Sequence, residues 1–156
     1  MNKDCRFCEI IGGDRNAEEI VFENNEFIVV SDRNRKTSSG GICLIIPKQH
    51  VPNILELTEQ DGNGLIKIQS LVGKAMERAF KCNGIRIWTA VNKAAGQSIF
   101  HCHIHLVPCN SIMDRIIASY SGLYDLKKRI FGKRKLSEKV NFELAEKIRA
   151  EIKASR

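Results

Sequence analysis

The sequence predicts an α+β fold, and three observations support this prediction. Short runs of β-branched and aromatic residues at 20–22, 27–30 and 42–46 are separated by turn-forming residues, which indicates strands. Apolar residues with helical spacing follow at 65–80, and a second such pattern begins near residue 141. With 156 residues, 43% of them hydrophobic, the chain is long enough to bury one sizeable core.

The first strands are predicted to form a hairpin, followed by a buried strand. Asn24 and Asn25 supply the turn between the first two apolar runs. The polar stretch 33–41 is expected to be a loop. The uninterrupted apolar run 42–46 is then expected to be a strand that ends at Pro47.

The longest predicted element is a helix in the middle of the chain. Thr58 and Asp61 have the spacing of a capping box, and apolar residues keep helical spacing over 65–80. Asn83 and Gly84 are expected to end this helix in the left-handed conformation.

Two further strands and a final helix complete the predicted fold. Residues 85–91 and 99–107 have strand patterns, and the Gly-containing stretch 92–98 between them is expected to be a loop. A last helix is predicted from about residue 141, with apolar residues on one stripe and charged residues elsewhere.

Charge and hydropathy argue against several classes of protein. The net charge is +7, but residues 1–126 hold 14 basic and 14 acidic residues, so all of the excess lies in residues 127–156. A uniformly basic nucleic-acid-binding domain is therefore not indicated. No apolar run approaches the roughly 18 residues of a membrane helix. Because no signal peptide follows the charged N-terminus, we expect a cytoplasmic protein that does not bind membranes.

Six cysteines in a chain without a secretion signal are expected to be thiols or metal ligands rather than disulfides. Cys5 and Cys8 have the spacing of a zinc half-site, which is a weak signal on its own. The other four lie among apolar residues and are expected to pack in the core. They are Cys43, Cys82, Cys102 and Cys109.

Three of the four histidines occur in one short row. His101, His103 and His105 alternate with apolar residues, so on a strand their rings project from one face. Such a row either binds a metal or holds one imidazole as a nucleophile while its neighbours set tautomer and charge. The amide, hydroxyl and glycine residues within 92–98, just before the row, suit contact with anionic oxygens.

The row and the residues before it resemble the histidine triad family of nucleotide hydrolases and transferases. Gly96-Gln97-Ser98 stands before the row as it does in that family. Three upstream segments, residues 22–25, 29–32 and 44–50, are similar to successive segments of the family in the right order. The resemblance covers roughly residues 5–108.

The resemblance implies a fold and a division of the chain. The expected fold is an antiparallel five-stranded half-barrel sheet with one main helix and a C-terminal helix. Residues 1–110 would form the family's domain. Residues 111–156 would form a basic extension whose terminal helix packs on the same domain.

The resemblance also implies a mechanism and a set of substrate contacts. His103 would attack the α-phosphate of a nucleotide and form a covalent nucleotidyl-histidine, which water or another acceptor then takes apart. His105 would contact phosphate, His101 would complete the catalytic row, and Ser98 would assist the leaving group. Asn92 and Gln97 would hold phosphate oxygens, and Asp32 would accept hydrogen bonds from the ribose hydroxyls. The residues that would line the base pocket are Phe7, Ile10 and Val30.

The same resemblance implies a structural zinc ion. In several bacterial members, the histidine after Pro-Lys and the first histidine of the row complete the Cys-x-x-Cys pair. Here the four ligands would be Cys5, Cys8, His50 and His101, which would tie the N-terminal arm to the row. The family's chemistry requires no catalytic metal.

The sequence leaves two functions open. The first is a homodimeric hydrolase that cleaves purine nucleoside phosphoramidates or dinucleoside polyphosphates at the α-phosphate and releases a nucleoside monophosphate. The alternative is a zinc-stabilised nucleotide-binding or RNA/protein interaction module without significant catalysis. The intact histidine row favours the enzyme, whereas the basic clusters at 127–129 and 133–135 motivate the alternative.

Overall fold

Five antiparallel strands form one sheet, with the order β1-β2-β3-β5-β4. The structure is a computed structural model that describes residues 4–14, 20–37, 39–112, 114 and 137–155. The strands are β1 (Ile20–Glu23), β2 (Phe27–Lys36), β3 (Gly41–Pro47), β4 (Gly84–Trp88) and β5 (Ile104–Cys109). The predicted α+β class and five-stranded antiparallel sheet are confirmed.

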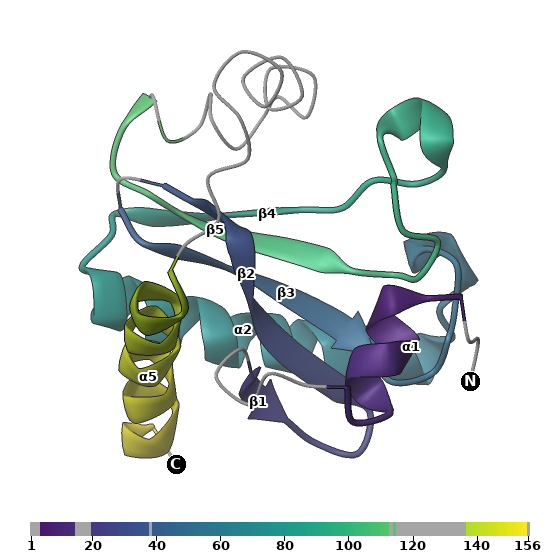
Figure 1. The fold of residues 1–156 in the computed structure, drawn as a ribbon, viewed down its shortest axis with the longest axis horizontal. Coiled ribbons are helices and arrows are strands. Elements are labelled where there is room, and N and C mark those ends of the chain that lie inside the picture. Colours follow the sequence, from purple (N-terminus) through teal and green to yellow (C-terminus); the bar gives the residue numbers. More distant parts are fainter. Residues whose placement is uncertain (1–3, 15–19, 38, 113, 115–136, 156) are drawn as a thin grey trace.

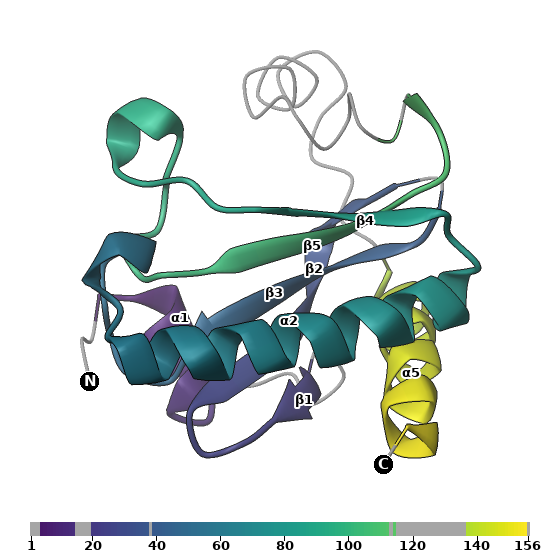
Figure 2. The same cartoon turned by 180° about the vertical axis from the view of Figure 1, so that it is seen from behind.

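Helices cover both faces of this sheet. The long helix α2 lies along one face and the short helix α1 lies against the other, while α5 stands at the far end of the sheet from α1 (Figures 1 and 2). None of the described helices is both long enough and apolar enough to cross a membrane. The helices are α1 (Arg6–Ile11), α2 (Glu59–Phe80) and α5 (Glu138–Ala154), with short 3₁₀ turns η2 (Ile54–Glu56) and η3 (Lys93–Ala95).

The sheet separates two apolar clusters. Along β2, Phe27 and Val29 belong to the larger cluster with α2 and α5, whereas Ile28 and Val30 belong to the smaller cluster with α1. This alternation follows from the period of two along a strand. Because β2 is buried on both faces at this point, its side chains read as one uninterrupted apolar run.

The main helix begins as the sequence predicts and ends earlier. Thr58 and Asp61 form the capping box, with each side chain accepting a hydrogen bond from the backbone amide of the other. The expected stop at Asn83 and Gly84 is wrong, because the helix ends at Phe80 and Lys81 takes the left-handed conformation with φ of 50°. A hydrogen bond from the amide of Cys82 to the carbonyl of Glu77 closes the end.

The last predicted strand is wrong at its start. It was expected over residues 99–107 but β5 begins at Ile104. The cause is a hydrogen bond of 2.7 Å from the amide of Cys102 to the carbonyl of Val51, which holds this segment to the loop after β3. The side chain of Cys102 is nonetheless buried in the α2 cluster with those of Ile104 and Leu106, so the predicted alternation persists.

Two other predicted boundaries are corrected. The predicted loop 33–41 is largely strand, since β2 continues to Lys36 before the chain turns into β3. The pairing of β2 with β3 shifts register between Ser31 and Lys36, and such an irregularity lets a polar stretch continue a strand. The predicted strand 85–91 ends at Trp88, where the chain leaves the sheet for the loop that contains η3.

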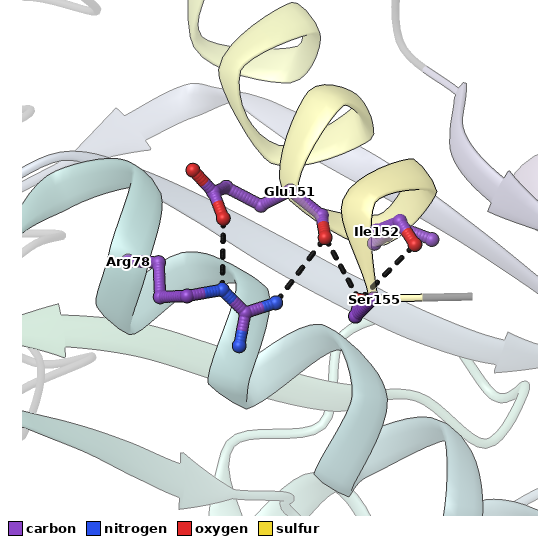
Figure 3. A network of polar contacts seen from close by, with 4 residues as sticks. All are labelled: Arg78, Glu151, Ile152 and Ser155. Atoms are coloured by element: carbon purple, nitrogen blue, oxygen red, sulfur yellow. Dashed lines mark hydrogen bonds and ion pairs between the residues drawn. The ribbon is translucent and has the colours of Figure 1, made fainter.

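The C-terminal helix packs on the sheet and on α2. Ser137 caps α5, so the helix begins at Glu138 rather than near residue 141. Its Asn141 accepts a buried hydrogen bond of 2.7 Å from Ser31 of β2. Figure 3 shows Arg78 of α2 donating to the carboxylate and the carbonyl of Glu151.

The division into residues 1–110 and 111–156 stays a prediction. The basic clusters at 127–129 and 133–135 lie outside the described residues. The core assignment of the four scattered cysteines is confirmed for three of them, and the fourth is half-buried. The three are Cys43, Cys82 and Cys102, and the fourth is Cys109.

Candidate functional site

The three imidazoles of the row form a chain of ring contacts. The ring centroids of His103 and His105 lie 5.2 Å apart, and the ring of Phe7 from α1 lies 5.1 Å from His103 and 5.8 Å from His101. All three histidines are at most 8% exposed. The predicted common face therefore exists, although only His105 lies on β5.

His103 is held in a defined tautomer by the backbone. Its Nδ1 lies 2.7 Å from the carbonyl oxygen of His101. Because a carbonyl only accepts, Nδ1 carries the proton and Nε2 carries the lone pair of the neutral ring. The hydroxyl of Thr89 donates to the carbonyl of His103 at 2.7 Å, which fixes the backbone that carries the ring.

His101 has the opposite tautomer to His103. Its Nε2 lies 2.8 Å from the carbonyl oxygen of Pro47 at the end of β3, so Nε2 donates and Nδ1 carries the lone pair. Nδ1 faces the sulfurs of Cys5 and Cys8 at 3.5 and 3.7 Å. Burial lowers the pKa of His101, and the neighbouring His50 and His103 act in the same direction. The ring is thereby kept in the neutral form that a metal ligand needs.

Cys5, Cys8, His50 and His101 come together as one group, with their ligand atoms all within 4.8 Å of one another. Cys5 caps α1 and Cys8 lies one turn further on, so helical spacing puts both thiols on one side. Zinc–sulfur bonds of about 2.3 Å and zinc–nitrogen bonds of about 2.05 Å at tetrahedral angles place sulfur and nitrogen about 3.6 Å apart. The observed separations of 3.2, 3.5 and 3.7 Å fit this geometry, so the group could hold a metal ion.

The loop before the row is organised around Gln97. Its side-chain oxygen accepts from the amide of Asn92 at 2.8 Å, and its Nε2 donates to the carbonyls of Pro52 and Ile99 at 2.6 and 3.0 Å. Gln97 is 3% exposed, so in this structure its amide group holds the loop together. Its predicted contact with phosphate oxygens remains a prediction.

Asn92 begins this loop in an unusual backbone conformation. Its φ is 66° and its ψ 166°, a region that side-chain-bearing residues rarely adopt. Its side chain is exposed, and so is that of Ser98 at the other end of the loop. Both residues are therefore accessible to solvent, and their predicted contacts with the substrate stay predictions.

The predicted base residues lie on the sheet face that carries α1. Phe7, Ile10 and Val30 share the smaller apolar cluster and are 4–7% exposed. The structure thus brings these three residues to the side of the sheet where Phe7 contacts the histidine row. Asp32 is half-buried on β2, in the stretch where the register against β3 shifts, and its contact with the ribose stays a prediction.

Two residues next to the row were not predicted from the sequence. Trp88 of β4 stacks on His105, with ring centroids 4.1 Å apart and an angle of 4° between the planes. Thr89, the next residue, holds the backbone of His103. Both depend on the register of β4 against β5, which pairs Trp88 with His105, and a single sequence carries no signal for that register.

Comparisons with known proteins place this geometry in a family. The family model described as HIT domain matches residues 14–112. An uncharacterised HIT-like protein of Saccharolobus solfataricus is 36% identical over 104 residues, which cover 67% of this chain and 73% of that protein. An adenylylsulfatase of Arabidopsis thaliana is 32% identical over 69% of this chain and 53% of its own length. A bis(5'-adenosyl)-triphosphatase of Dictyostelium discoideum is 32% identical over 48% of this chain and 50% of its own.

Solved structures agree with these relatives. A histidine triad nucleotide-binding protein from Sulfolobus tokodaii superposes with a TM-score of 0.75 and 32% identity, over 96% of this chain and 93% of its own. A zinc-bound histidine triad family protein from Mycobacterium smegmatis shares the fold, with a TM-score of 0.70, 22% identity and 98% coverage of both chains. The fold, the histidine row and the family-model match together show that this chain belongs to the HIT domain family.

Proposed function

We propose that the protein is a nucleotide hydrolase in which His103 attacks the α-phosphate of the substrate. The observation that carries this proposal is the hydrogen bond from Nδ1 of His103 to the carbonyl of His101, because in the neutral ring it places the lone pair, which the nucleophile needs, on Nε2. Family membership supports hydrolysis of a nucleotide in general terms. The nucleophile and the bond cleaved are our proposal.

The reaction proceeds in two displacements. In the first, the Nε2 lone pair of His103 forms a bond to the α-phosphorus, and the leaving group departs with the electron pair of its bond to phosphorus. Ser98 is proposed to donate a hydrogen bond to that group. In the second, water attacks the same phosphorus, the nitrogen–phosphorus bond breaks, and a nucleoside monophosphate and a proton are released.

The remaining contacts stabilise substrate and developing charge. His105 is proposed to contact the phosphate directly, and donors of the Gln97 loop, including Asn92, to hold its oxygens as charge develops. The carboxylate of Asp32 would accept hydrogen bonds from the ribose hydroxyls. The base would lie against the apolar cluster of Phe7, Ile10 and Val30, whose side chains must shift to expose a surface because they are nearly fully buried here.

We propose a purine nucleotide derivative as substrate, either a nucleoside phosphoramidate or a dinucleoside polyphosphate. The names of two relatives support an adenosine compound, since they are an adenylylsulfatase and a bis(5'-adenosyl)-triphosphatase. Adenosine phosphoramidates, diadenosine polyphosphates and adenylyl sulfate have one feature in common. In each, the α-phosphate of adenosine is bonded to a group that departs as an anion or an amine. Adenylyl sulfate therefore belongs in the same assay.

We also propose that Cys5, Cys8, His50 and His101 hold a structural zinc ion. With four protein ligands, such a site is closed to substrate, so the metal would stabilise the fold rather than activate water. Its effect on the reaction would be indirect. It would fix α1 against the row, and α1 carries Phe7, which contacts the ring of His103.

A homodimer is the proposed assembly. Strand β4 is an edge of the sheet, and its Ile87 is a large apolar residue that is 47% exposed. Unpaired edge strands pair readily with a second copy of themselves across a two-fold axis. We expect Ile87→Lys to shift the mass measured by light scattering from dimer to monomer, and an unchanged mass would place the interface elsewhere.

The deciding experiment compares wild type with His103→Ala and His103→Asn on an adenosine phosphoramidate, a diadenosine polyphosphate and adenylyl sulfate. We expect AMP release by the wild type and a loss of at least about 10³-fold in both variants. Thermal unfolding confirms that each variant is folded. Wild-type protein that binds AMP but releases none from any substrate would contradict the proposal and favour the binding module.

A further inference from the structure

The contact between Trp88 and His105 is the tightest ring contact in the described part of the chain. The planes are 4° from parallel and the centroids 4.1 Å apart, which is a parallel stacked contact rather than an edge contact. The two residues are paired across the ladder of β4 and β5, so two backbones set the stack. Trp88 is the chain's only tryptophan, so a substitution there removes the only indole.

The stack restricts the χ2 torsion angle of His105, which the backbone conformation does not determine. The ring of a histidine turns about χ2 in a broad, roughly two-fold well, so a strand position alone does not orient it. A flat indole against one face of His105 restricts that rotation. The ring of His103 meets His105 at 67° from the side, so the two contacts together define where the nitrogens of His105 point.

No hydrogen bond within the described residues holds the indole. Its Nε1 is buried and makes no hydrogen bond within that part of the chain. A buried indole N–H usually has a partner, so its position here follows from the stack and from packing rather than from a polar contact. Replacing Trp88 by an apolar residue therefore leaves no described hydrogen-bonding group stranded, which makes the substitution a clean probe.

We infer that Trp88 is a positioning residue, which holds the imidazole of His105 in the orientation in which it contacts the phosphate of a bound nucleotide. The inference rests on the proposed role of His105 in phosphate binding. The ring contacts of His105 in the described residues are with Trp88 and His103. The indole of Trp88 carries no formal charge, so its proposed effect on His105 is geometric.

The test uses the full chain as Trp88→Leu, Trp88→Phe and a matched control, Phe142→Leu. Phe142 is 43% exposed on α5, the helix at the far end of the sheet from α1 (Figure 1), so it controls for the loss of an aromatic ring. NMR with labelled histidine follows the ring protons of His105, assigned through His105→Ala, before and after addition of AMP. Steady-state kinetics give kcat and KM for each variant.

We expect the indole ring current to shift the His105 protons upfield in wild type, and Trp88→Leu to abolish that shift. AMP should move the His105 protons in wild type and less in Trp88→Leu. Because small misplacements of a catalytic group are costly, kcat/KM should fall about 10- to 100-fold in Trp88→Leu. Trp88→Phe, which keeps a flat ring, should recover most of it, and Phe142→Leu should match wild type.

The outcomes separate this inference from the proposed function. Equal AMP-induced shifts of His105 in wild type and Trp88→Leu would overturn the inference, whatever the activity. Equal loss in Trp88→Phe and Trp88→Leu would also overturn it, because bulk rather than ring shape would then be responsible. A wild type that releases no AMP, but whose His105 response to AMP depends on Trp88, would overturn the proposed function and leave the inference standing.

Discussion

The first two histidines of the row are in different states. The Nε2–H of His101 donates to the carbonyl of Pro47 and its Nδ1 faces the thiols, whereas the Nδ1–H of His103 donates to the carbonyl of His101, which places the lone pair on Nε2. The two rings therefore differ in their backbone acceptor. A carbonyl within reach of one ring nitrogen decides whether a neutral imidazole serves the metal group or the proposed reaction.

The largest effects are expected when the imidazoles of His103 and His101 are removed one at a time. We expect His103→Ala to abolish AMP release, by at least about 10³-fold, while retaining bound zinc. His101→Ala should lose the zinc and unfold at a lower temperature, because it removes a ligand and leaves the thiols unpaired with metal. Metal analysis and thermal unfolding of both variants provide the measurement. Loss of zinc from His103→Ala would show that His101 and His103 do not have separate roles.

A second prediction concerns the metal group alone. Because loss of a partner that only orients a ligand already weakens metal binding about 10- to 100-fold, Cys8→Ser should weaken zinc binding by more than that. Activity should fall less than in His103→Ala, since the nucleophile stays in place and only the support from α1 is weakened. Zinc competition with a chelator measures the first effect.

Cys109→Ser is the matched control for this prediction. Cys109 is half-buried at the end of β5 and does not belong to the metal group. The zinc affinity of the Cys109→Ser variant should equal that of wild type. If Cys8→Ser and Cys109→Ser bind zinc equally, the assignment of the four ligands is wrong.

The residues of the metal group could be predicted from the sequence, whereas the histidine tautomers could not. The spacing in Cys5-x-x-Cys8 and in the row is local, and the resemblance supplied His50, so the metal group could be named in advance. The tautomers could not, because the acceptor for His101 is the carbonyl of Pro47, which lies 54 residues away. Trp88 was missed for the same reason, since its partner is set by strand register.

The fold shows the same limit. Helix α2 was predicted with its N-terminal cap because Thr58 and Asp61 act within one turn. The start of β5 was wrong because the amide of Cys102 bonds the distant carbonyl of Val51. Local signals thus predicted the elements and the start of α2, whereas a contact between distant segments decided the start of β5.

A smaller effect is expected from the backbone that carries His103. Thr89→Val removes the hydroxyl that donates to the carbonyl of His103 at 2.7 Å and keeps the side-chain shape. We expect kcat to fall about tenfold through misplacement of the nucleophile, with zinc content unchanged. Thr89→Ser keeps the donor and should behave as wild type. If both variants have wild-type kcat, this hydrogen bond does not position the nucleophile.

The last prediction concerns the reactivity of Cys102, the residue between His101 and His103, toward thiol reagents. Cys102 points into the α2 core and is 1% exposed, while the rings on either side of it point to the opposite face. Burial raises the pKa of Cys102 to about 11 and that of Cys43 to about 12, the latter with a contribution from Asp32. Both thiols therefore remain protonated and shielded near pH 8, where thiolates are the reactive species.

We expect a thiol reagent at pH 8 to label neither Cys102 nor Cys43 in the folded protein, and to label both after unfolding. Cys5 and Cys8 should become reactive once a chelator removes the metal. The raised pKa values favour the folded state below the ordinary thiol pKa of 9.0, and this contribution is lost as the pH rises toward 11–12. Rapid labelling of Cys102 in native protein, mapped by mass spectrometry, would mean that the segment between His101 and His103 does not alternate.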